Sequence, residues 1–250
     1  MSIVIVTGAS RGIGASTAVL AAQRGMGVIL TYNSHPSGAE KTVRTIEAEG
    51  GKAVAIRLDV SKVSTFAAFR ADVAVALEAT WERDRFDGLV NNAGYGLFNP
   101  IETVTEAEFD GLLNVHLKGP FFLTQALLPL MSEGASIVNM ASATSRVATP
   151  GVAPYASFKG GLEVLTRYMA KEFASRRIRA NSVAPGAIRT DMTSEALDQN
   201  PEWTTMLAGQ TALGRIGEPE DVGRVVVNLL SADSGWINAQ NIEVGGGYNI

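Results

Sequence analysis

The sequence contains no cysteine, which excludes disulfide bonds, thiolate metal sites and a cysteine nucleophile. Histidine is nearly as scarce: His35 and His116 are the two in the chain, and neither stands in a metal-ligand spacing. We therefore expect no bound metal, and we interpret His116 as a helix-surface or interface residue rather than a catalytic base. A basic block is also missing and the formal net charge is −4, so nothing indicates a nucleic-acid partner.

Long apolar runs are missing as well. No stretch approaches the roughly 20 apolar residues of a membrane span, and the first residues, MSIVIVTGAS, lack the charged n-region of a signal peptide. We therefore expect a cytoplasmic protein that does not contact a membrane. What the chain does have is 250 residues of which 46% are hydrophobic, which suits one large α/β domain or two small ones.

Short apolar segments alternate with helical patterns from one end of the chain to the other. Strands are expected at residues 3–7, 27–32, 53–60, 87–92, 136–142, 178–185 and 241–244, and helices at 15–25, 37–50, 64–80, 105–131, 154–175 and 219–231. Pro120 lies inside the helical region 105–131, where we expect a kink. The alternation predicts a parallel sheet with helices on both faces, and the lack of a linker indicates one domain over residues 1–250. In such a sheet, ligands bind beyond the carboxyl ends of the strands.

A glycine-rich turn, TGASRGIG, joins the first strand to the first helix. Gly8, Gly12 and Gly14 stand in a G-x-x-x-G-x-G spacing, not in the G-x-G-x-x-G of the standard dinucleotide motif. The physical effect is the same, because glycines let the backbone approach a ligand and the helix N-terminus presents free N–H groups to a pyrophosphate. A dinucleotide site is therefore favoured over a plain glycine-rich turn.

No carboxylate follows the second strand, where an NAD enzyme usually carries the acid that binds the adenosine ribose. The chain reads Thr31-Tyr32-Asn33-Ser34 there, and Arg11 lies in the glycine-rich turn. An arginine with hydroxyl and amide donors nearby suits a 2′-phosphate. The sequence thus favours NADP over NAD, with a merely solvated Arg11 as the alternative.

Polar or small residues also follow the third, fourth and fifth strands. Asp59, followed by Val60, is either an acceptor for an adenine amino group or, equally well, a helix N-cap. The NNAG segment at 91–94 would let a cofactor approach the backbone. Ser142 ends the fifth strand, and the pentapeptide YASFK follows at 155–159.

Tyr155 and Lys159 are four positions apart, so on a helix they face the same way. A phenol with an ordinary pKa near 10 is a poor acid at neutral pH. A neighbouring ammonium should lower that pKa toward the range in which general acid–base catalysis is efficient. The Ser142 hydroxyl would hold a substrate oxygen near the phenol. These groups suit the reduction of a carbonyl, which needs a hydride donor, a proton donor and support for the developing alkoxide.

Taken in order, these motifs resemble the short-chain dehydrogenase/reductase family. The resemblance covers essentially the whole chain and rests on TGASRGIG, Asp59-Val60, NNAG, Asn114, Ser142, YASFK and PGAIRT at 185–190. Within the family, the chain looks most like 3-oxoacyl-[acyl-carrier-protein] reductases and general NADPH ketone reductases. The resemblance implies a three-layer α/β/α Rossmann fold with a doubly wound parallel sheet of about seven strands. It also implies a homotetramer, or a homodimer, in which the helices at 105–131 and 154–175 pack together.

The resemblance assigns roles to individual residues. The expected catalytic residues are Ser142, Tyr155, Lys159 and Asn114, with Lys159 also holding the nicotinamide ribose and Asn114 supporting a water chain to solvent. A structural hydrogen bond within the helix would explain Asn114 nearly as well, and a helix N-cap would explain Thr190. The expected cofactor-binding residues are Gly8, Ser10, Arg11, Gly12, Ile13, Gly14, Asn33, Ser34, Asp59, Val60, Asn92, Ala93, Gly94, Tyr155, Lys159, Pro185, Gly186, Ile188 and Thr190.

Residues 190–213 lack a strong pattern, and the resemblance implies that they form a lid over the substrate. An apolar substrate face is one interpretation of the apolar side chains there and after NNAG; lid core or a subunit interface is the other. The residues concerned are Tyr95, Phe98, Met192, Trp203 and Met206. As a whole the sequence predicts an NADPH-dependent reductase that converts a ketone to a secondary alcohol. An NAD(P)-dependent alcohol or sugar dehydrogenase is the alternative, and a nucleotide-binding regulator without turnover is the alternative of another class.

Overall fold

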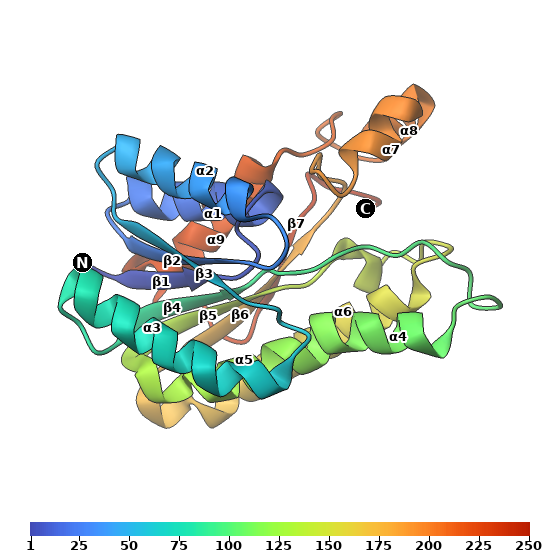
Figure 1. Cartoon of the computed structure of the whole chain (residues 1–250). Coiled ribbons are helices and arrows are strands. Elements are labelled where there is room, and N and C mark those ends of the chain that lie inside the picture. Colours follow the sequence, from blue (N-terminus) through green and yellow to red (C-terminus); the bar gives the residue numbers. More distant parts are fainter.

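The chain folds around one parallel sheet of seven strands, which lies between layers of helices in Figure 1. The computed structural model describes residues 1–250 apart from the side chains of residues 195 and 196. The strand order is β3-β2-β1-β4-β5-β6-β7, and every neighbouring pair is parallel. The predicted doubly wound Rossmann fold is thereby confirmed. The strands are β1 (Ile3–Val6), β2 (Gly27–Tyr32), β3 (Ala53–Arg57), β4 (Phe86–Asn91), β5 (Met131–Met140), β6 (Arg179–Pro185) and β7 (Asn241–Val244).

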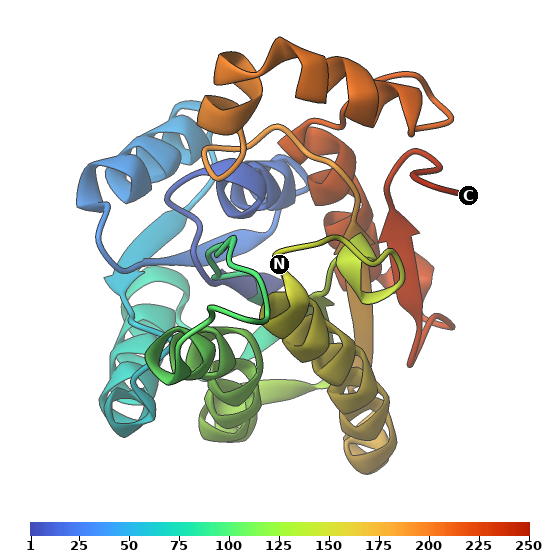
Figure 2. The same ribbon diagram turned by 90° about the vertical axis from the view of Figure 1, so that its right-hand side faces the viewer.

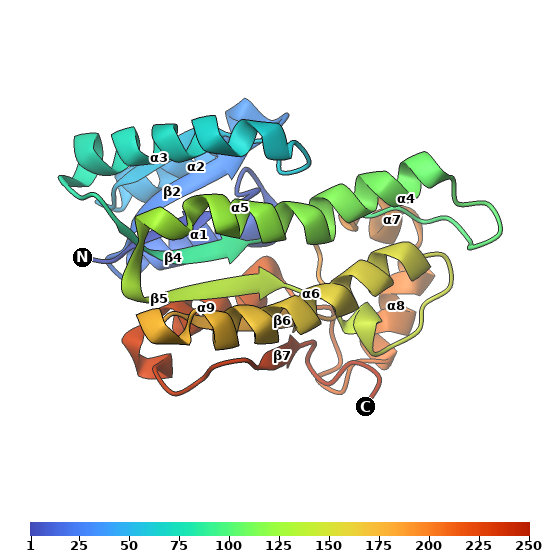
Figure 3. The same cartoon turned by 90° about the horizontal axis from the view of Figure 1, so that it is seen from below.

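Helices cover both faces of the sheet and so complete three layers (Figures 1 and 3). This two-sided cover explains the strand sequences, because a strand that is buried on both faces needs apolar residues at consecutive positions. β1, with the sequence IVIV, is buried at every position. One face carries α1 (Gly12–Gln23), α2 (Pro36–Ala48) and α9 (Pro219–Leu230), and the other carries α3 (Phe66–Trp81), α5 (Gly119–Leu127) and α6 (Ala153–Glu172).

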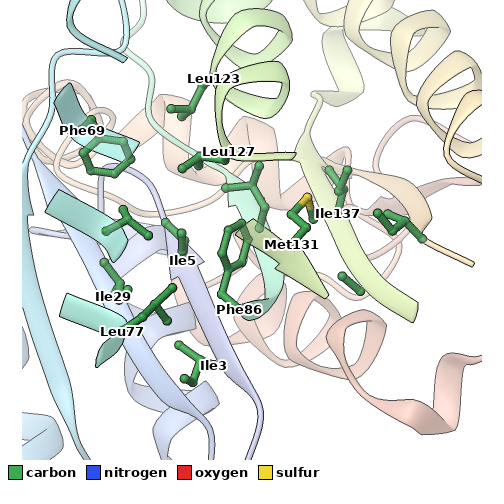
Figure 4. Packing of buried hydrophobic residues seen from close by; sticks show 14 of the residues in the cluster. Ile3, Ile5, Ile29, Phe69, Leu77, Phe86, Leu123, Leu127, Met131 and Ile137 are labelled. Carbon is green, nitrogen blue, oxygen red and sulfur yellow. The ribbon is translucent and has the colours of Figure 1, made fainter. Parts of the chain in front are cut away.

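Each face of the sheet has its own hydrophobic core. Figure 4 shows the core on the side of α3 and α5, where Phe86 of β4 belongs to the same cluster as Leu127 and Met131. These three side chains have no exposed surface. Burying one side chain of this kind contributes about 1.5–3 kcal/mol relative to leaving it exposed. The packed core holds the strands in register and so determines where their carboxyl ends lie.

The helix predicted over 105–131 is interrupted near its middle. Pro120 has no N–H to donate to a carbonyl four residues back, and the N–H of Gly119 reaches the carbonyl of Asn114 in a wider, π-helical turn. The expected kink is therefore a local change of helix type, which turns the following side chains relative to a regular helix. The segment consists of α4 (Glu106–Leu113), the π-helical turn (Asn114–Lys118), α5 and a 3₁₀ turn (Leu128–Leu130).

The carboxyl ends of the strands meet at one edge of the sheet, and α4, α6 and the segment 190–213 extend beyond that edge (Figure 3). Two short helices, α7 (Ser194–Gln199) and α8 (Pro201–Gly209), lie within this segment, which was predicted to have little regular structure. Figure 2 shows them across the top of the edge, away from the sheet. Over Pro201–Gly209 no side chain is buried, so α8 needs no clear apolar face, and its sequence pattern is weak for that reason.

None of the helices in the described part of the chain has the length and apolar character needed to traverse a bilayer.

Candidate functional site

The glycine-rich turn after β1 has a backbone that larger residues would block. Gly8 and Gly12 have left-handed φ values of 64° and 56°, which glycine tolerates without strain. A Cβ atom on Gly8 would lie 2.7 Å from the Cα of Ala93, and one on Gly14 would lie 2.5 Å from Nδ2 of Asn92. Because α1 begins at Gly12 with no side-chain cap, its first N–H groups are free to bind an anion. This cradle fits the pyrophosphate of a dinucleotide.

The NNAG segment fastens the glycine-rich turn to the end of β4. Oγ1 of Thr7 accepts the backbone N–H groups of Asn92 (2.9 Å) and Ala93 (3.0 Å), and Nδ2 of Asn92 donates to the carbonyl oxygen of Thr7 (2.8 Å). The Asn92 amide is therefore engaged within the protein. Its contribution to a cofactor site is to shape the cradle, while the exposed backbone at Gly94 lies open beside it.

The segment after β2 lies beside the same turn. Asn33 and Ser34 are exposed there, and the following helix packs so closely that a Cβ on Gly38 would lie 2.5 Å from the carbonyl oxygen of Ser10. Asn33, Ser34 and the glycine-rich turn thus share one end of the site.

Arg11, which the sequence selected as the 2′-phosphate ligand, extends from the glycine-rich turn into solvent. Its guanidinium lies 3.7 Å from the carboxylate of Asp191, at the base of the proposed lid. An exposed ion pair at this distance contributes about 0–1 kcal/mol. A phosphate would therefore replace Asp191 at little cost.

Asp59, after β3, binds within its own turn. Its Oδ1 accepts the N–H and the hydroxyl of Ser61 (3.0 and 2.6 Å), and its Oδ2 lies 3.7 Å from Nζ of Lys62. Burial acts to raise the pKa of Asp59, but the hydrogen bonds from Ser61 and the charge of Lys62 prevail and lower it. The carboxylate therefore stabilises its own turn, but the helix N-cap alternative is wrong, because the next helical turn, Val63–Thr65, is preceded by Lys62 and has no side-chain cap. The contact of Asp59 with adenine stays a prediction, as does that of Val60.

Ser142, Tyr155 and Lys159 meet where β5 ends and α6 begins. Oγ of Ser142 accepts the backbone N–H and the hydroxyl of Thr144 (3.2 and 2.9 Å), and Ser142 is also a hydrogen-bond partner of the Tyr155 side chain. Nζ of Lys159 lies 5.4 Å from the centroid of the Tyr155 ring and donates to the carbonyl oxygen of Met140 (2.5 Å). The spacing in YASFK thus brings both side chains to one side of α6, as predicted.

Burial dominates the titration of Tyr155 and Lys159. It raises the pKa of Tyr155 above its ordinary value, and the hydrogen bond with Ser142 offsets this only in part. It lowers the pKa of Lys159 to about 7. The expectation that Lys159 lowers the pKa of Tyr155 is therefore wrong for this structure. Burial thus favours the neutral amine, and here Nζ is bound to the Met140 carbonyl rather than to the phenol oxygen.

His116 is a residue of the site that the sequence interpretation missed. It is only 2% exposed, and its ring centroid lies 4.9 Å from that of Tyr155. It lies in the π-helical turn that begins at Asn114, where the helical periodicity is broken, so a regular helix pattern assigns it to the wrong side. Pro120 was the sequence signal that could have indicated this break in the helical periodicity. The same turn packs against α6 and brings Asn114 to this part of the fold.

The PGAIRT segment leads from β6 back to the glycine-rich turn. Pro185 is the last residue of the strand, and the side chain of Ile188 is buried, which leaves its backbone at the edge. A Cβ atom on Gly12 would lie 3.6 Å from the Cβ of Thr190, so Thr190 faces the cradle. The carbonyl of Thr190 accepts the N–H groups of Thr193 and Ser194 in the turn that precedes α7. The helix N-cap alternative for Thr190 is wrong, because α7 begins only at Ser194.

A tether that the sequence did not predict joins the loop after Ser142 to the C-terminal residues. Arg146 donates to both carboxylate oxygens of Glu243 (2.8 and 2.6 Å) and to the carbonyls of Tyr248 (2.8 Å) and Asn249 (3.0 Å). The C-terminal residues in turn pair with residues 210–213 at the end of the proposed lid. No local pattern reveals such a contact, because its partners are far apart in the chain.

Where side chains are described, no three His, Asp or Glu groups are placed to hold a metal ion. The groups gathered at the carboxyl edge are a glycine cradle, an exposed arginine, a buried serine and lysine, and a partly buried tyrosine. They suit a phosphate-bearing cofactor and a carbonyl compound.

Known oxidoreductases are similar to this chain over nearly its whole length. A family model described as Enoyl-(Acyl carrier protein) reductase matches residues 8–249. An uncharacterized oxidoreductase of Methylorubrum extorquens is 38% identical over 98% of this chain and 96% of its own length. The hydroxynaphthalene reductase-like protein Arp2 of Metarhizium majus is 36% identical over 98% of this chain and 94% of its own.

Solved structures are similar over the whole chain. The promiscuous reductase LugOII, which catalyses keto-reduction at C1 during lugdunomycin biosynthesis, has a TM-score of 0.94 and 35% identity, with 100% of this chain and 98% of that one covered. The angucycline C-6 ketoreductase LanV with bound NADP has a TM-score of 0.94 and 33% identity over 99% of this chain and 95% of its own. The chain therefore belongs to the short-chain dehydrogenase/reductase family of oxidoreductases.

Proposed function

We propose that the protein is an NADPH-dependent reductase that converts a ketone to a secondary alcohol. The observation that carries the proposal is the meeting of Ser142, Tyr155 and Lys159 at the edge of the sheet where the glycine cradle also lies. Relatives that are named as ketoreductases support it.

In this proposal each polar group of the site has a defined role. The reduced nicotinamide, when bound, supplies the hydride. Ser142 holds the carbonyl oxygen, and Tyr155 donates the proton that turns the alkoxide into the alcohol. Lys159 holds the nicotinamide ribose and, when charged, stabilises the remaining phenolate. Asn114, at the start of the π-helical turn, supports the water chain that returns the proton from solvent.

The raised pKa of Tyr155 favours the reductive direction. A general acid must be protonated before it donates, and a phenol with a raised pKa is protonated throughout the neutral range. An alcohol dehydrogenase would need the same group as a phenolate base, which burial makes harder to form. Reduction is therefore proposed ahead of oxidation for this site.

NADPH is proposed as the cofactor because of the charges at the adenosine end. Arg11 is exposed and held only by a weak ion pair, Asn33 and Ser34 are exposed donors, and no carboxylate follows β2 to repel a 2′-phosphate. The LanV ketoreductase is bound to NADP. The cradle would take the pyrophosphate, and Arg11 with the two donors would take the 2′-phosphate.

The substrate is proposed to be a bulky, apolar ketone with fused rings. Exposed apolar side chains follow NNAG and lie in the segment 190–213, and two close approaches involve them. A Cβ on Gly151 would lie 2.8 Å from the Phe98 ring, and one on Gly96 would lie 3.3 Å from Sδ of Met192, so the segment after NNAG touches both the loop before α6 and the base of the lid. An apolar ligand would cover such a surface. Two relatives are named a hydroxynaphthalene reductase-like protein and an angucycline C-6 ketoreductase, and these names point to the same class. The exposed side chains are Tyr95, Phe98, Met192, Trp203 and Met206.

The function is tested by initial rates with NADPH and NADH over a panel of ketones. We expect turnover with NADPH, faster on fused-ring ketones than on small polar ones. We expect Arg11→Ala to raise the KM for NADPH by about tenfold to a hundredfold, since a hydrogen bond to a charged group contributes about 1.5–3 kcal/mol, and to leave the KM for NADH unchanged.

Arg24→Ala is the matched control, because Arg24 is an exposed arginine beyond the other end of α1. An equal effect of Arg11→Ala on both cofactors would contradict the 2′-phosphate assignment. Faster turnover of small polar ketones would contradict the substrate class. Binding of NADPH with no turnover on any carbonyl would favour the regulator.

We further propose that the protein is a homotetramer, with a homodimer as the alternative, through the outer faces of α5 and α6. Phe121, Val164 and Tyr168 leave an exposed apolar groove there. We expect sedimentation velocity to give four times the chain mass for the wild type. We expect a smaller mass for Val164→Arg, because the substitution would bury a charge in an apolar interface. Val75→Arg is the control, since Val75 is also exposed (68%, against 45% for Val164) but lies on α3. A wild-type monomer would contradict the proposal.

A cytoplasmic location stays a prediction from the sequence.

A further inference from the structure

His116 occupies the space between the catalytic helix and the segment that follows β4. Its Nε2 lies 2.8 Å from the carbonyl oxygen of Tyr95. Because a carbonyl can only accept, Nε2 carries the hydrogen and Nδ1 is bare. Nδ1 is buried and has no hydrogen-bond partner among the described residues. Burial and the nearby charge of Lys159 lower the pKa of His116 to about 3, so the ring is neutral throughout the neutral range.

The ring of His116 contacts its neighbours closely on several sides. It meets the Tyr155 ring edge-to-face, with the centroids 4.9 Å apart and the planes at 82°. On another side, a Cβ atom on Gly94 would lie 2.7 Å from Cε1 of His116, so the absence of a side chain at Gly94 is what lets the ring fit. The Tyr95 ring lies 5.7 Å away on the same segment. One side chain thus contacts both the proposed proton donor and the wall of the proposed substrate site.

We propose that His116 is a positioning residue that holds the Tyr155 phenol and the Tyr95 wall in one fixed arrangement, through its ring on one side and its Nε2–H on the other. This inference rests on the proposed function. The Tyr155 phenol must stay within hydrogen-bond reach of the substrate oxygen, and small displacements of a reacting group are costly in rate. Edge-to-face packing restrains the phenol, and the hydrogen bond to the Tyr95 carbonyl restrains the wall.

The two contacts can be separated by two substitutions. His116→Gln keeps an amide N–H that can reach the Tyr95 carbonyl but loses the ring. His116→Phe keeps the ring but loses the donor. If the two contacts have different tasks, His116→Gln affects the proton donor, Tyr155, and His116→Phe affects the substrate-site wall at Tyr95. A residue that only filled space would give the same defect in both variants.

The experiment measures kcat and KM for a fused-ring ketone at saturating NADPH, together with thermal unfolding of each variant. We expect His116→Gln to lower kcat by about tenfold, since an aromatic pair contributes about 0.5–1.5 kcal/mol, with KM little changed. We expect His116→Phe to raise KM by about tenfold, since a net hydrogen bond contributes about 0.5–1.5 kcal/mol, with kcat little changed. His116→Ala should show both defects. His35→Gln, at the exposed second histidine, is the control and should show neither.

A failure of this inference and a failure of the proposed function give different results. Suppose that the wild type turns over normally and that folded His116→Gln and His116→Phe both keep kcat and KM within about twofold of wild type. This result would overturn the role of His116 and leave the proposed function standing. Its role would also be overturned if both variants showed the same changes in kcat and KM, because the split would then be absent. No turnover by the wild type on any ketone would overturn the proposed function and this inference with it.

Discussion

Tyr155→Phe is expected to lose turnover by about 10³-fold, within the range that a positioned general acid contributes, while NADPH binds as before. The substitution removes one oxygen and keeps the ring, so the edge-to-face contact with His116 and the burial of the site remain. The loss should therefore fall on kcat, because the proton donor acts in the chemical step rather than in binding. Single-turnover rates and a fluorescence titration with NADPH measure the two quantities separately.

Tyr168→Phe provides the matched control on the same helix. Tyr168 is 62% exposed and lies on the outer part of α6, so removal of its hydroxyl should leave kcat within about twofold of wild type, as for a surface change away from the site. Retained turnover in Tyr155→Phe would remove Tyr155 from the mechanism. Lost NADPH binding would show instead that the phenol serves the cofactor site.

Lys159→Met is expected to abolish turnover and, at neutral or lower pH, to raise the melting temperature by on the order of 5 °C. Lys159 is 4% exposed, and burial lowers its pKa from 10.5 to about 7. A buried charge opposes folding, and Met replaces it with an apolar chain of similar length. The hydrogen bond to the Met140 carbonyl is lost in the variant, which offsets part of the gain.

The sign of the pH dependence follows from the protons bound in each state. Below pH 7 both the folded and the unfolded chain hold the Lys159 proton, so the destabilisation is present in full. Between about pH 7 and 10.5 the unfolded chain still binds the proton while the folded protein has released it. The cost of burying the charge is therefore relieved progressively across this window, and it is absent above the window.

The direction within the window is set by that difference in bound protons. A folded state that binds fewer protons than the unfolded state gains stability as the pH rises, so the wild type becomes more stable between about pH 7 and 10.5. The advantage of Lys159→Met should therefore be largest at or below pH 7 and shrink as the pH rises toward 10.

Differential scanning calorimetry of both proteins at several pH values tests this directly, because subtracting wild type from variant cancels the titration of other groups. Lys171→Met, at an exposed lysine near the end of the same helix, should show no pH-dependent gain. If the melting temperature of Lys159→Met exceeded that of wild type by the same amount at every pH, Lys159 would not be buried as a titrating amine. If the melting temperature of the variant were lower than that of wild type at pH 6, the fold would stabilise the charge of Lys159.

The fold and most of the candidate site followed from the sequence, and the differences have local causes. The seven strands were found because each is a short apolar run, and the site was found because residues at the strand ends share one edge of the sheet. β5 begins at Met131, earlier than predicted, because Met131 pairs with Phe86 ahead of an irregularity in the ladder. Such an irregular pairing leaves no apolar pattern to read. The weak pattern of α8 likewise follows from its exposed position.

The sequence by itself determined which chemical groups the site contains and on which elements they lie. Strands buried on both faces require consecutive apolar residues, and the spacing of Tyr155 and Lys159 is a property of one helix. Only the tertiary structure decided how those groups behave. The raised pKa of Tyr155, the lowered pKa of Lys159 and the inward position of His116 depend on burial and on contacts between segments far apart in the chain. Desolvation is a property of everything that surrounds a group, and no local pattern of residues records it.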